Sequence, residues 1–378
     1  MKPNRLVLAV APVVLAVIGL SGCASLSPYA ATVNGATISR SQLDAELNDI
    51  SKTPRYVTAL TSGGSSIQGT VAGTYDKSFV ANILNRRIVY TLVHQETVKH
   101  NLHPSAADVT SAKGQLGQSQ TYTDSTGSFF STFPASYQQE LAVRQAEVNA
   151  LETVVGTADA VKQYYGAHPD QFVAEACVRH ILLAVKDASG NIDYPATLAQ
   201  ANKIKAQLDA GADFATLAKA DSQDNAAQGG SAANGGQLTG SATDGCLNSQ
   251  DLSGLVTPFA QAAATAALNK VTDPVQTQFG YHLILVTSRK IAALTDQGVS
   301  GYASGQLVSQ LIQSDLKVAK LKVNAEFGTI DTTNSVPQVV PPSTPSTGPT
   351  TTSTAPAPAT PGSTAPPSGP PAPSTSSP

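Results

Sequence analysis

The stretch Cys177-Val178-Arg179-His180-Ile181-Leu182-Leu183-Ala184-Val185 places a histidine near the start of an apolar run. Later in the chain, Gln278-Phe279-Gly280-Tyr281-His282-Leu283-Ile284-Leu285-Val286 repeats that arrangement. Short runs rich in aliphatic and β-branched residues predict β-strands. We therefore expect two strands of one small sheet, with the imidazoles of His180 and His282 meeting at its centre.

Composition limits the protein to a few classes. The chain has 378 residues, enough for two modest domains with extensions, and only 13% of them are charged. Its formal net charge is −3. Because no basic stripe is present to neutralise phosphates, we exclude nucleic acid as a principal partner.

The N-terminus is typical of a secreted protein. Lys2 and Arg5 precede an apolar run, residues 6–20, which is too short for a spanning helix and fits a secretory signal. The following Leu20-Ser21-Gly22-Cys23 resembles a bacterial lipobox, which implies that Cys23 becomes the lipidated (palmitate-bearing) first residue of the mature protein. We expect an extracytoplasmic lipoprotein anchored to the cell membrane. Cleavage elsewhere and an uncleaved anchor are the alternatives.

The chain has three cysteines. If Cys23 carries lipid, Cys177 and Cys246 remain as a pair in an oxidising compartment, where a disulfide between them is reasonable. The alternative is two unpaired, partly buried thiols. Neither cysteine lies in a nucleophile signature.

The region after Cys23 predicts a hairpin followed by helices. Asn34-Gly35 between β-prone residues indicates a tight turn, and Ser39 with Gln42 forms a capping box. In a later helix, Arg86 and Arg87 lie off the apolar row and are expected to face solvent. This opening resembles the start of the chaperone region in SurA-like and PrsA-like foldases.

Three further histidines, His94, His100 and His103, raise the question of a metal site. No Cys, Asp or Glu completes a ligand set next to them in the sequence, and Pro104 follows at once. We expect surface histidines and no bound metal.

Six short segments, in order, resemble a parvulin-type peptidyl-prolyl isomerase. They are Arg179-His180-Ile181-Leu182, Asp213-Phe214-Ala215-Thr216-Leu217-Ala218, Ser222-Gln223-Asp224, Gly235-Gly236-Gln237-Leu238, Pro258-Phe259 and Pro274-Val275-Gln276-Thr277-Gln278-Phe279-Gly280-Tyr281-His282. The resemblance implies an α+β fold: a four-stranded antiparallel sheet with surrounding helices, joined to a mainly helical chaperone-like domain.

The resemblance also implies roles for individual residues. His180 and His282 match the paired central histidines, Asp224 the acidic position beside the substrate carbonyl, and Thr277 a hydroxyl that binds the histidine pair. Residues that match the prolyl pocket and substrate contacts are Leu238, Leu255, Phe259 and Phe279. No cofactor is implied. In the alternative, His180 and His282 only satisfy each other in a small core.

The sequence departs from the compact family pattern in its loops. Residues 226–234 and 239–254 form longer loops, and Cys246 lies in the second, so a disulfide to Cys177 could pin that loop to the first strand. The loop at 186–194 lacks the basic cluster of phosphate-selective parvulins. We therefore do not expect phosphorylated substrates.

The expected organisation follows from these segments. The predicted parts are a signal peptide (1–22), a lipidated Cys and tether (23–30), a helical chaperone domain (31–173), a parvulin domain (174–290), a C-terminal helix packing on the N-terminal domain (291–330, with its helix at 301–325) and a disordered Pro/Ser/Thr-rich tail (331–378).

The predicted function is isomerisation of X-Pro bonds, with chaperone activity, in unfolded or nascent secreted and cell-envelope proteins. The main alternative is a non-catalytic holdase that binds unfolded extracytoplasmic clients. A hydrolase using Ser222, Asp224 and one histidine is a weaker alternative, because no G-x-S-x-G elbow exists in the chain.

Overall fold

The computed structural model describes residues 28–342, apart from 63, 65, 72, 225–229 and 297. The expected signal peptide, the lipidated Cys23 and residues 343–378 of the expected tail lie outside the described residues. Among the described residues, no helix combines the length and the apolar character needed to cross a membrane.

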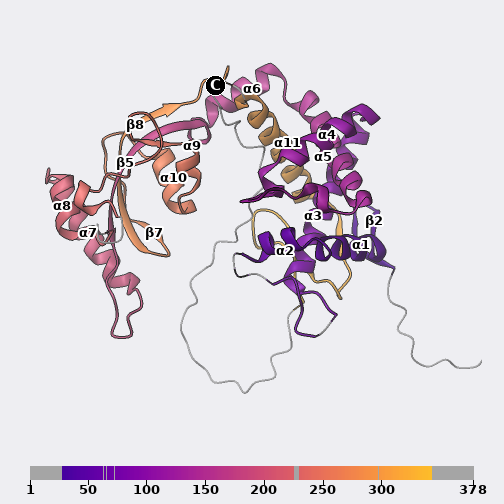
Figure 1. Cartoon of the computed structure of the whole chain (residues 1–378), viewed down its shortest axis with the longest axis horizontal. Coiled ribbons are helices and arrows are strands. Elements are labelled where there is room, and N and C mark those ends of the chain that lie inside the picture. The colour runs from indigo at the N-terminus through magenta and orange to yellow at the C-terminus, as the bar shows by residue number, and fades with distance from the viewer. Residues whose placement is uncertain are drawn as a thin grey trace, which may run out of the picture.

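Two regions are evident in Figure 1, one dominated by helices and the other by a sheet. The helical region contains β1 (Tyr29–Val33), β2 (Ala36–Ser39), α1 (Arg40–Ser51), α2 (Pro54–Thr61), α3 (Lys77–Lys99), α4 (Ala106–Gln118), β3 (Thr123–Asp124), β4 (Gly127–Ser128), α5 (Ala135–Val155), α11 (Val299–Val318), β9 (Leu321–Val323), β10 (Thr329–Asp331) and β11 (Gln338–Val340). The helix α6 (Ala158–Ala167) leads from it to the sheet region.

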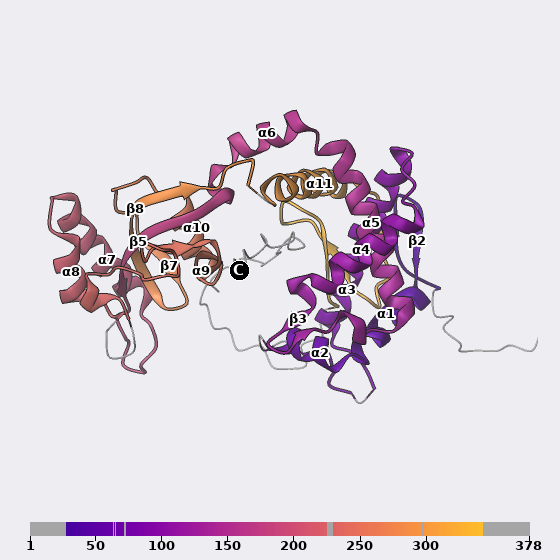
Figure 2. The same cartoon turned by 45° about the horizontal axis from the view of Figure 1, so that its top comes forward.

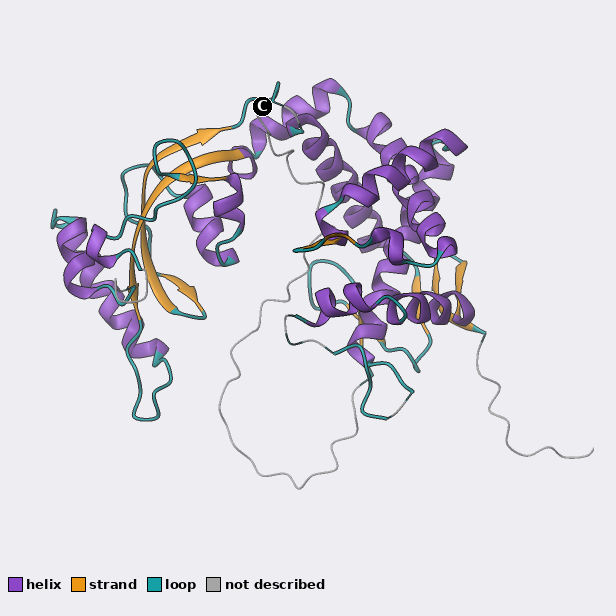
Figure 3. Cartoon of the chain, in the orientation of Figure 1, coloured by secondary structure: helices purple, strands orange, loops and turns teal. Residues whose placement is uncertain are grey.

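The sheet region contains β5 (Val173–Leu183), α7 (Tyr194–Asp209), α8 (Phe214–Asp221), β6 (Leu247–Asn248), α9 (Ser249–Ser253), α10 (Thr257–Thr265), β7 (Val275–Thr277) and β8 (Gly280–Ile291). Its strands are antiparallel in the order β6-β5-β8-β7. Figure 3 shows the long β5 and β8 side by side. The predicted α+β fold with a four-stranded antiparallel sheet is therefore confirmed.

Alternation along β5 and β8 gives this sheet two buried faces. Ile181 and Leu283 pack with α7 and α8 on one face. Val178 and Ile284 pack with α10 on the other, around Phe259. The face that carries Val178 and Ile284 also carries both histidines. Val178 lies two positions from His180 on β5, and Ile284 lies two positions from His282 on β8.

The first strands form the predicted hairpin. Asn34 and Gly35 both have positive φ, at 54° and 91°, as a two-residue turn of the kind that Asn-Gly favours requires. Ser39 then caps α1, and Gln42 returns a hydrogen bond to the backbone of Ser39. The tight turn and the capping box are thus confirmed.

The last long helix packs far from its sequence neighbours. Val308, Ile312 and Leu316 of α11 belong to the same hydrophobic core as residues of α3 and α5, and Figure 2 shows α11 beside that helical region. The apolar stripe of α11 is therefore buried against helices that precede it by about half the chain.

The helix was expected over residues 301–325, and the prediction of its C-terminal end is wrong. α11 stops at Val318, and β9 joins the hairpin, with Leu321 opposite Val33 and Val323 opposite Ala31. The apolar spacing of Leu321 fits a helix equally well, but a free edge of β1 offers backbone partners that a longer helix would leave unpaired.

The disordered tail was expected from residue 331, and this predicted start is also too early. β10 pairs with β11, and Val339 is buried in the helical core. The Asn85 side chain donates to the Val339 carbonyl at 2.9 Å and accepts from the Val339 N–H at 2.7 Å. The prediction was based on the Pro-rich average composition of the tail, which gives no sign of this short valine-containing run that can still bury apolar surface.

Arg86 and Arg87, expected to face solvent, instead surround a buried carboxylate. Glu46 is 1% exposed and lies within 2.7 Å of Arg86, 2.6 Å of Arg87 and 3.1 Å of Arg144. The Tyr137 hydroxyl donates to it at 3.0 Å. Burial alone would raise the pKa of Glu46, but the three guanidinium groups lower it to about 2.

Candidate functional site

His180 and His282 lie on the two central strands of the sheet. The register places His282 opposite Leu182, so His180 is its diagonal neighbour on the same face. Their Nδ1 atoms are 3.1 Å apart, and the two rings lie nearly parallel, 16° apart. Both side chains are buried, at 5% and 4% exposure. The structure therefore places the two imidazoles in direct contact.

The histidine pair is the middle of a longer hydrogen-bond chain. His180 Nε2 lies 2.8 Å from Oδ2 of Asp224, three residues after the end of α8, and the Thr277 hydroxyl lies 2.9 Å from His282 Nε2. The N–H of Phe279 donates to the Thr277 hydroxyl at 3.1 Å. All four residues matched to the catalytic positions thus belong to one connected network.

The donor and acceptor atoms of these side chains fix the direction of each hydrogen bond in the network. An ionised Asp224 only accepts, so His180 Nε2 must donate to it. A neutral His180 then accepts at Nδ1 from His282 Nδ1–H, and His282 Nε2 accepts from Thr277. These tautomers are assigned from the consistency of the network. Each member therefore fixes the proton position of the next.

Electrostatics favours the same protonation states. The hydrogen bond from His180, followed by those from Ser231, holds the pKa of Asp224 well below its usual range despite partial burial. Burial lowers the pKa of His282 to about 3, with a further lowering from neighbouring His180. At neutral pH, Asp224 is therefore an anion and His282 a neutral imidazole.

An aromatic ring covers the histidine pair. Phe259, at the start of α10, is 3% exposed, and its ring meets the imidazoles edge-on, with centroids 5.4 Å from His180 and 5.1 Å from His282. Leu238 and Leu255 pack against the same apolar cluster. These three residues matched to the pocket therefore share one core.

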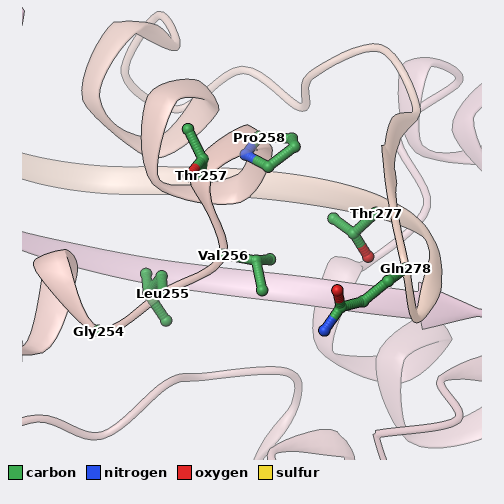
Figure 4. A pocket seen from close by; sticks show the side chains of 7 residues that line it. All are labelled: Gly254, Leu255, Val256, Thr257, Pro258, Thr277 and Gln278. Carbon is green, nitrogen blue, oxygen red and sulfur yellow. The ribbon is translucent and has the colours of Figure 1, made fainter. Parts of the chain in front are cut away.

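A cavity of about 400 Å³ opens next to the chain of hydrogen bonds. Figure 4 shows the side chains around it, and its lining residues are Gly254, Leu255, Val256, Thr257, Pro258, Thr277 and Gln278. Thr277 thus belongs both to the polar chain and to the cavity wall. The side chain of Phe279 is not among the lining residues and is 50% exposed.

Several contributors escaped sequence reasoning. Val256, Thr257 and Gln278 lie beside matched residues, so proximity in the sequence was the available signal. Ser231 binds Asp224, and the Tyr194 hydroxyl donates to the Thr277 carbonyl at 3.2 Å. Those two contacts depend on the fold and carry no local signature.

The second long loop is covalently attached to the first strand. Cys177 and Cys246 form a disulfide with Cα atoms 4.6 Å apart. β6, next to Cys246, also pairs with β5. Among the described residues, Cys177, Cys246 and Asp244 are the acidic or sulfur groups close enough to hold a metal, but the disulfide occupies both sulfurs.

The other candidate residues have different partners among the described residues. His94 and His103 are exposed and bind Glu147 and Asn101 respectively. Ser222 accepts the backbone N–H groups of Leu182 at 3.1 Å and Asp224 at 3.4 Å. Its hydroxyl therefore supports the backbone at Asp224 and, among the described residues, makes no hydrogen bond to an imidazole of the kind that a hydrolase would require.

Comparison with known proteins agrees with the geometry. Residues 164–290 match the family model described as PPIC-type PPIASE domain. This part of the chain is a parvulin-type domain.

Parts of the chain are similar to proteins named as foldases and chaperones. Foldase protein PrsA of Geobacillus kaustophilus is 36% identical over 37% of this chain and 40% of that protein. Chaperone SurA of Methylococcus capsulatus is 32% identical over 39% of this chain and 29% of that protein. These two alignments span less than half of either relative. Foldase protein PrsA of Clostridium kluyveri is 26% identical over 77% of this chain and 86% of that protein.

Proposed function

We propose that this chain is a peptidyl-prolyl cis-trans isomerase that acts on X-Pro bonds of unfolded proteins. The observation that carries the proposal is the Asp224–His180–His282–Thr277 hydrogen-bond chain, which ends at the wall of a cavity lined by both apolar and polar residues. The match to a PPIC-type domain and the relatives named PrsA and SurA support it.

The reaction needs neither a nucleophile nor a metal. Rotation about an X-Pro bond meets a barrier of about 18–20 kcal/mol because the amide loses its resonance in the twisted state. A ten-thousandfold acceleration corresponds to about 5.5 kcal/mol of extra transition-state stabilisation. The site therefore has to favour the twisted amide over both planar forms.

The residues divide this work between apolar and polar groups. The walls formed by Leu255 and Val256 would hold the proline ring and exclude water. The carboxylate of Asp224 would shape the polar surroundings of the carbonyl, and the histidines in fixed tautomers would keep that geometry preorganised. In this mechanism the imidazoles orient groups and transfer no proton.

The helical region fits a chaperone role. We propose that residues 31–173 form it together with α11 and the strands that follow, and that residues 174–290 form the isomerase domain between those parts. Clients would be unfolded or nascent secreted chains. An extracytoplasmic location, with a lipid on Cys23 as membrane anchor, is part of the proposal, and the Cys177–Cys246 disulfide suits such an oxidising compartment.

The test measures cis–trans exchange of a proline-containing peptide by NMR, with the intact chain added. We expect strong acceleration. Asp224→Asn should reduce it, and the matched control Asp209→Asn, on an exposed residue paired with Lys205, should not. An intact chain that suppresses aggregation of an unfolded client while exchange stays at the uncatalysed rate would favour the holdase alternative.

A further inference from the structure

One oxygen of the Asp224 carboxylate collects three hydrogen-bond donors. Oδ2 lies 2.8 Å from His180 Nε2, 2.8 Å from the Ser231 N–H and 2.7 Å from the Ser231 hydroxyl. Ser231 is 8% exposed. Two of the three donors to this oxygen therefore come from one buried residue that sequence motifs did not single out.

Ser231 is held in place by the backbone on both sides. The Ala232 N–H donates to the Asp224 carbonyl at 2.8 Å, and the Gly236 N–H donates to the Ser231 carbonyl at 2.9 Å. The segment from Ser231 to Gly236 is thus hydrogen-bonded at one end to the backbone of Asp224. These backbone hydrogen bonds favour a fixed orientation of the Ser231 hydroxyl.

The same segment ends on the histidine strand. The His180 N–H donates to the Gly236 carbonyl at 2.8 Å, and the Leu238 N–H donates to the Val178 carbonyl at 2.9 Å. Gly236 has φ 78°, and a Cβ there would lie 2.3 Å from the His180 carbonyl oxygen. Backbone hydrogen bonds therefore join the segment from Ser231 to Leu238 to the strand that carries His180.

We propose that Ser231 is a positioning residue: its hydroxyl and N–H turn the Asp224 carboxylate toward His180 and so set the direction of the hydrogen-bond chain. This inference rests on the isomerase function proposed above. Hydrogen bonds to an ionised acceptor are stronger than neutral ones, so the hydroxyl contributes to both the orientation and the charge of Asp224. Removing it leaves the backbone N–H and the fold of the segment in place.

The charge environment of Asp224 makes the inference measurable. The titratable groups that face it are His180 on β5 and, through His180, His282 on β8. The bond from His180 has the largest lowering effect on the pKa of Asp224, followed by the N–H and hydroxyl of Ser231. Loss of the hydroxyl should therefore raise that pKa while His180 stays in contact.

The experiment compares the full chain with Ser231→Ala, Ser231→Thr and a control, Ser105→Ala. Ser105 donates its N–H and hydroxyl to a single oxygen of Asp108 at 2.7 and 2.8 Å, the same arrangement in the helical region. NMR of ¹³C-labelled aspartate follows the Asp224 carboxyl against pH, and peptide exchange gives kcat/KM over the same range.

In Ser231→Ala we expect the Asp224 midpoint to rise by about one pH unit and kcat/KM at neutral pH to fall about tenfold. The acid limb of the pH profile should move with the carboxyl. Ser231→Thr should restore both, and Ser105→Ala should change neither. A purely structural defect would instead lower kcat/KM equally at every pH.

Two results overturn different statements. If the Asp224 midpoint and the acid limb are the same in Ser231→Ala and wild type, Ser231 does not position the carboxylate. If the wild-type chain shows no isomerase activity but the Asp224 midpoint moves in Ser231→Ala, the proposed function fails while the positioning role stands.

Discussion

The Glu46 cluster makes a prediction about the helical region. Replacing Glu46 by Gln keeps the shape of the side chain but removes the negative charge at the centre of Arg86, Arg87 and Arg144. Arg87 and Arg144 then keep one carboxylate partner, Glu140, whose side chain is 41% exposed. Arg86 keeps its contacts with the hydroxyls of Tyr56 and Tyr137. We expect marked loss of stability, because breaking a buried ion pair leaves charge uncompensated.

The pKa of Glu46 gives the size of the effect. A carboxyl pKa that falls from an ordinary 4.5 to about 2 on folding corresponds to about 3 kcal/mol, at roughly 1.4 kcal/mol per pH unit. Because the folded pKa is lowered, this stabilisation is complete above pH 4.5 and is lost as the pH falls toward 2. Glu46→Gln should lack that acid dependence and lose about 3–5 kcal/mol at neutral pH.

Hydrogen exchange followed by mass spectrometry measures this loss of stability separately in each region of the chain. Peptides from α1, α3 and α5 should exchange faster in Glu46→Gln, whereas peptides from β5 and β8 serve as an internal reference. Glu140→Gln is the matched control and should cost less than about 1 kcal/mol, since that carboxylate is half exposed. Unchanged protection of α3 in Glu46→Gln would refute the reasoning.

Three further predictions concern the sheet region. Replacing Cys177 and Cys246 by serine removes a link across 69 residues and should lower the free energy of unfolding by about 4 kcal/mol, checked by denaturant titration; an unchanged midpoint would contradict it. Thr277→Val should leave His282 Nε2 without its donor and cost about 1–3 kcal/mol, seen as a lower melting temperature and slower peptide exchange than in Thr272→Val. Since the pKa of His282 falls from 6.5 to about 3 on folding, the stability of the sheet should decrease as pH drops through that window, and His282→Leu should flatten this dependence in acid titrations followed by circular dichroism.

Sequence reasoning reached the two central strands because they leave local patterns, and the resemblance to a known family supplied the polar centre. The aliphatic runs after His180 and His282 predict strands, whereas Asp224 and Thr277 were assigned by the resemblance to parvulin-type isomerases. Contacts within such segments depend on residues that are close together in the sequence. The Asn34-Gly35 turn and the Ser39 cap belong to the same group, since each is decided by two to four residues.

Features that depend on distant partners were beyond that reasoning. Arg144 meets Glu46 across 98 residues, and nothing near either residue indicates the pairing. Leu321 fits a helical stripe, yet β1 supplies a strand partner and ends the helix at Val318. Tertiary contacts overrode local preference in both places. Ser231 binds Asp224 seven positions earlier in the chain, and no local motif indicates that contact.

The most direct test replaces both central histidines, His180 and His282, with leucine and measures catalysed cis–trans exchange in a proline peptide. The control replaces the exposed His94 and His103. Circular dichroism and the melting temperature establish that each variant is folded. We predict that the control keeps wild-type kcat/KM and that the central variant loses most of the acceleration. Full activity in a folded His180→Leu, His282→Leu chain would contradict the account.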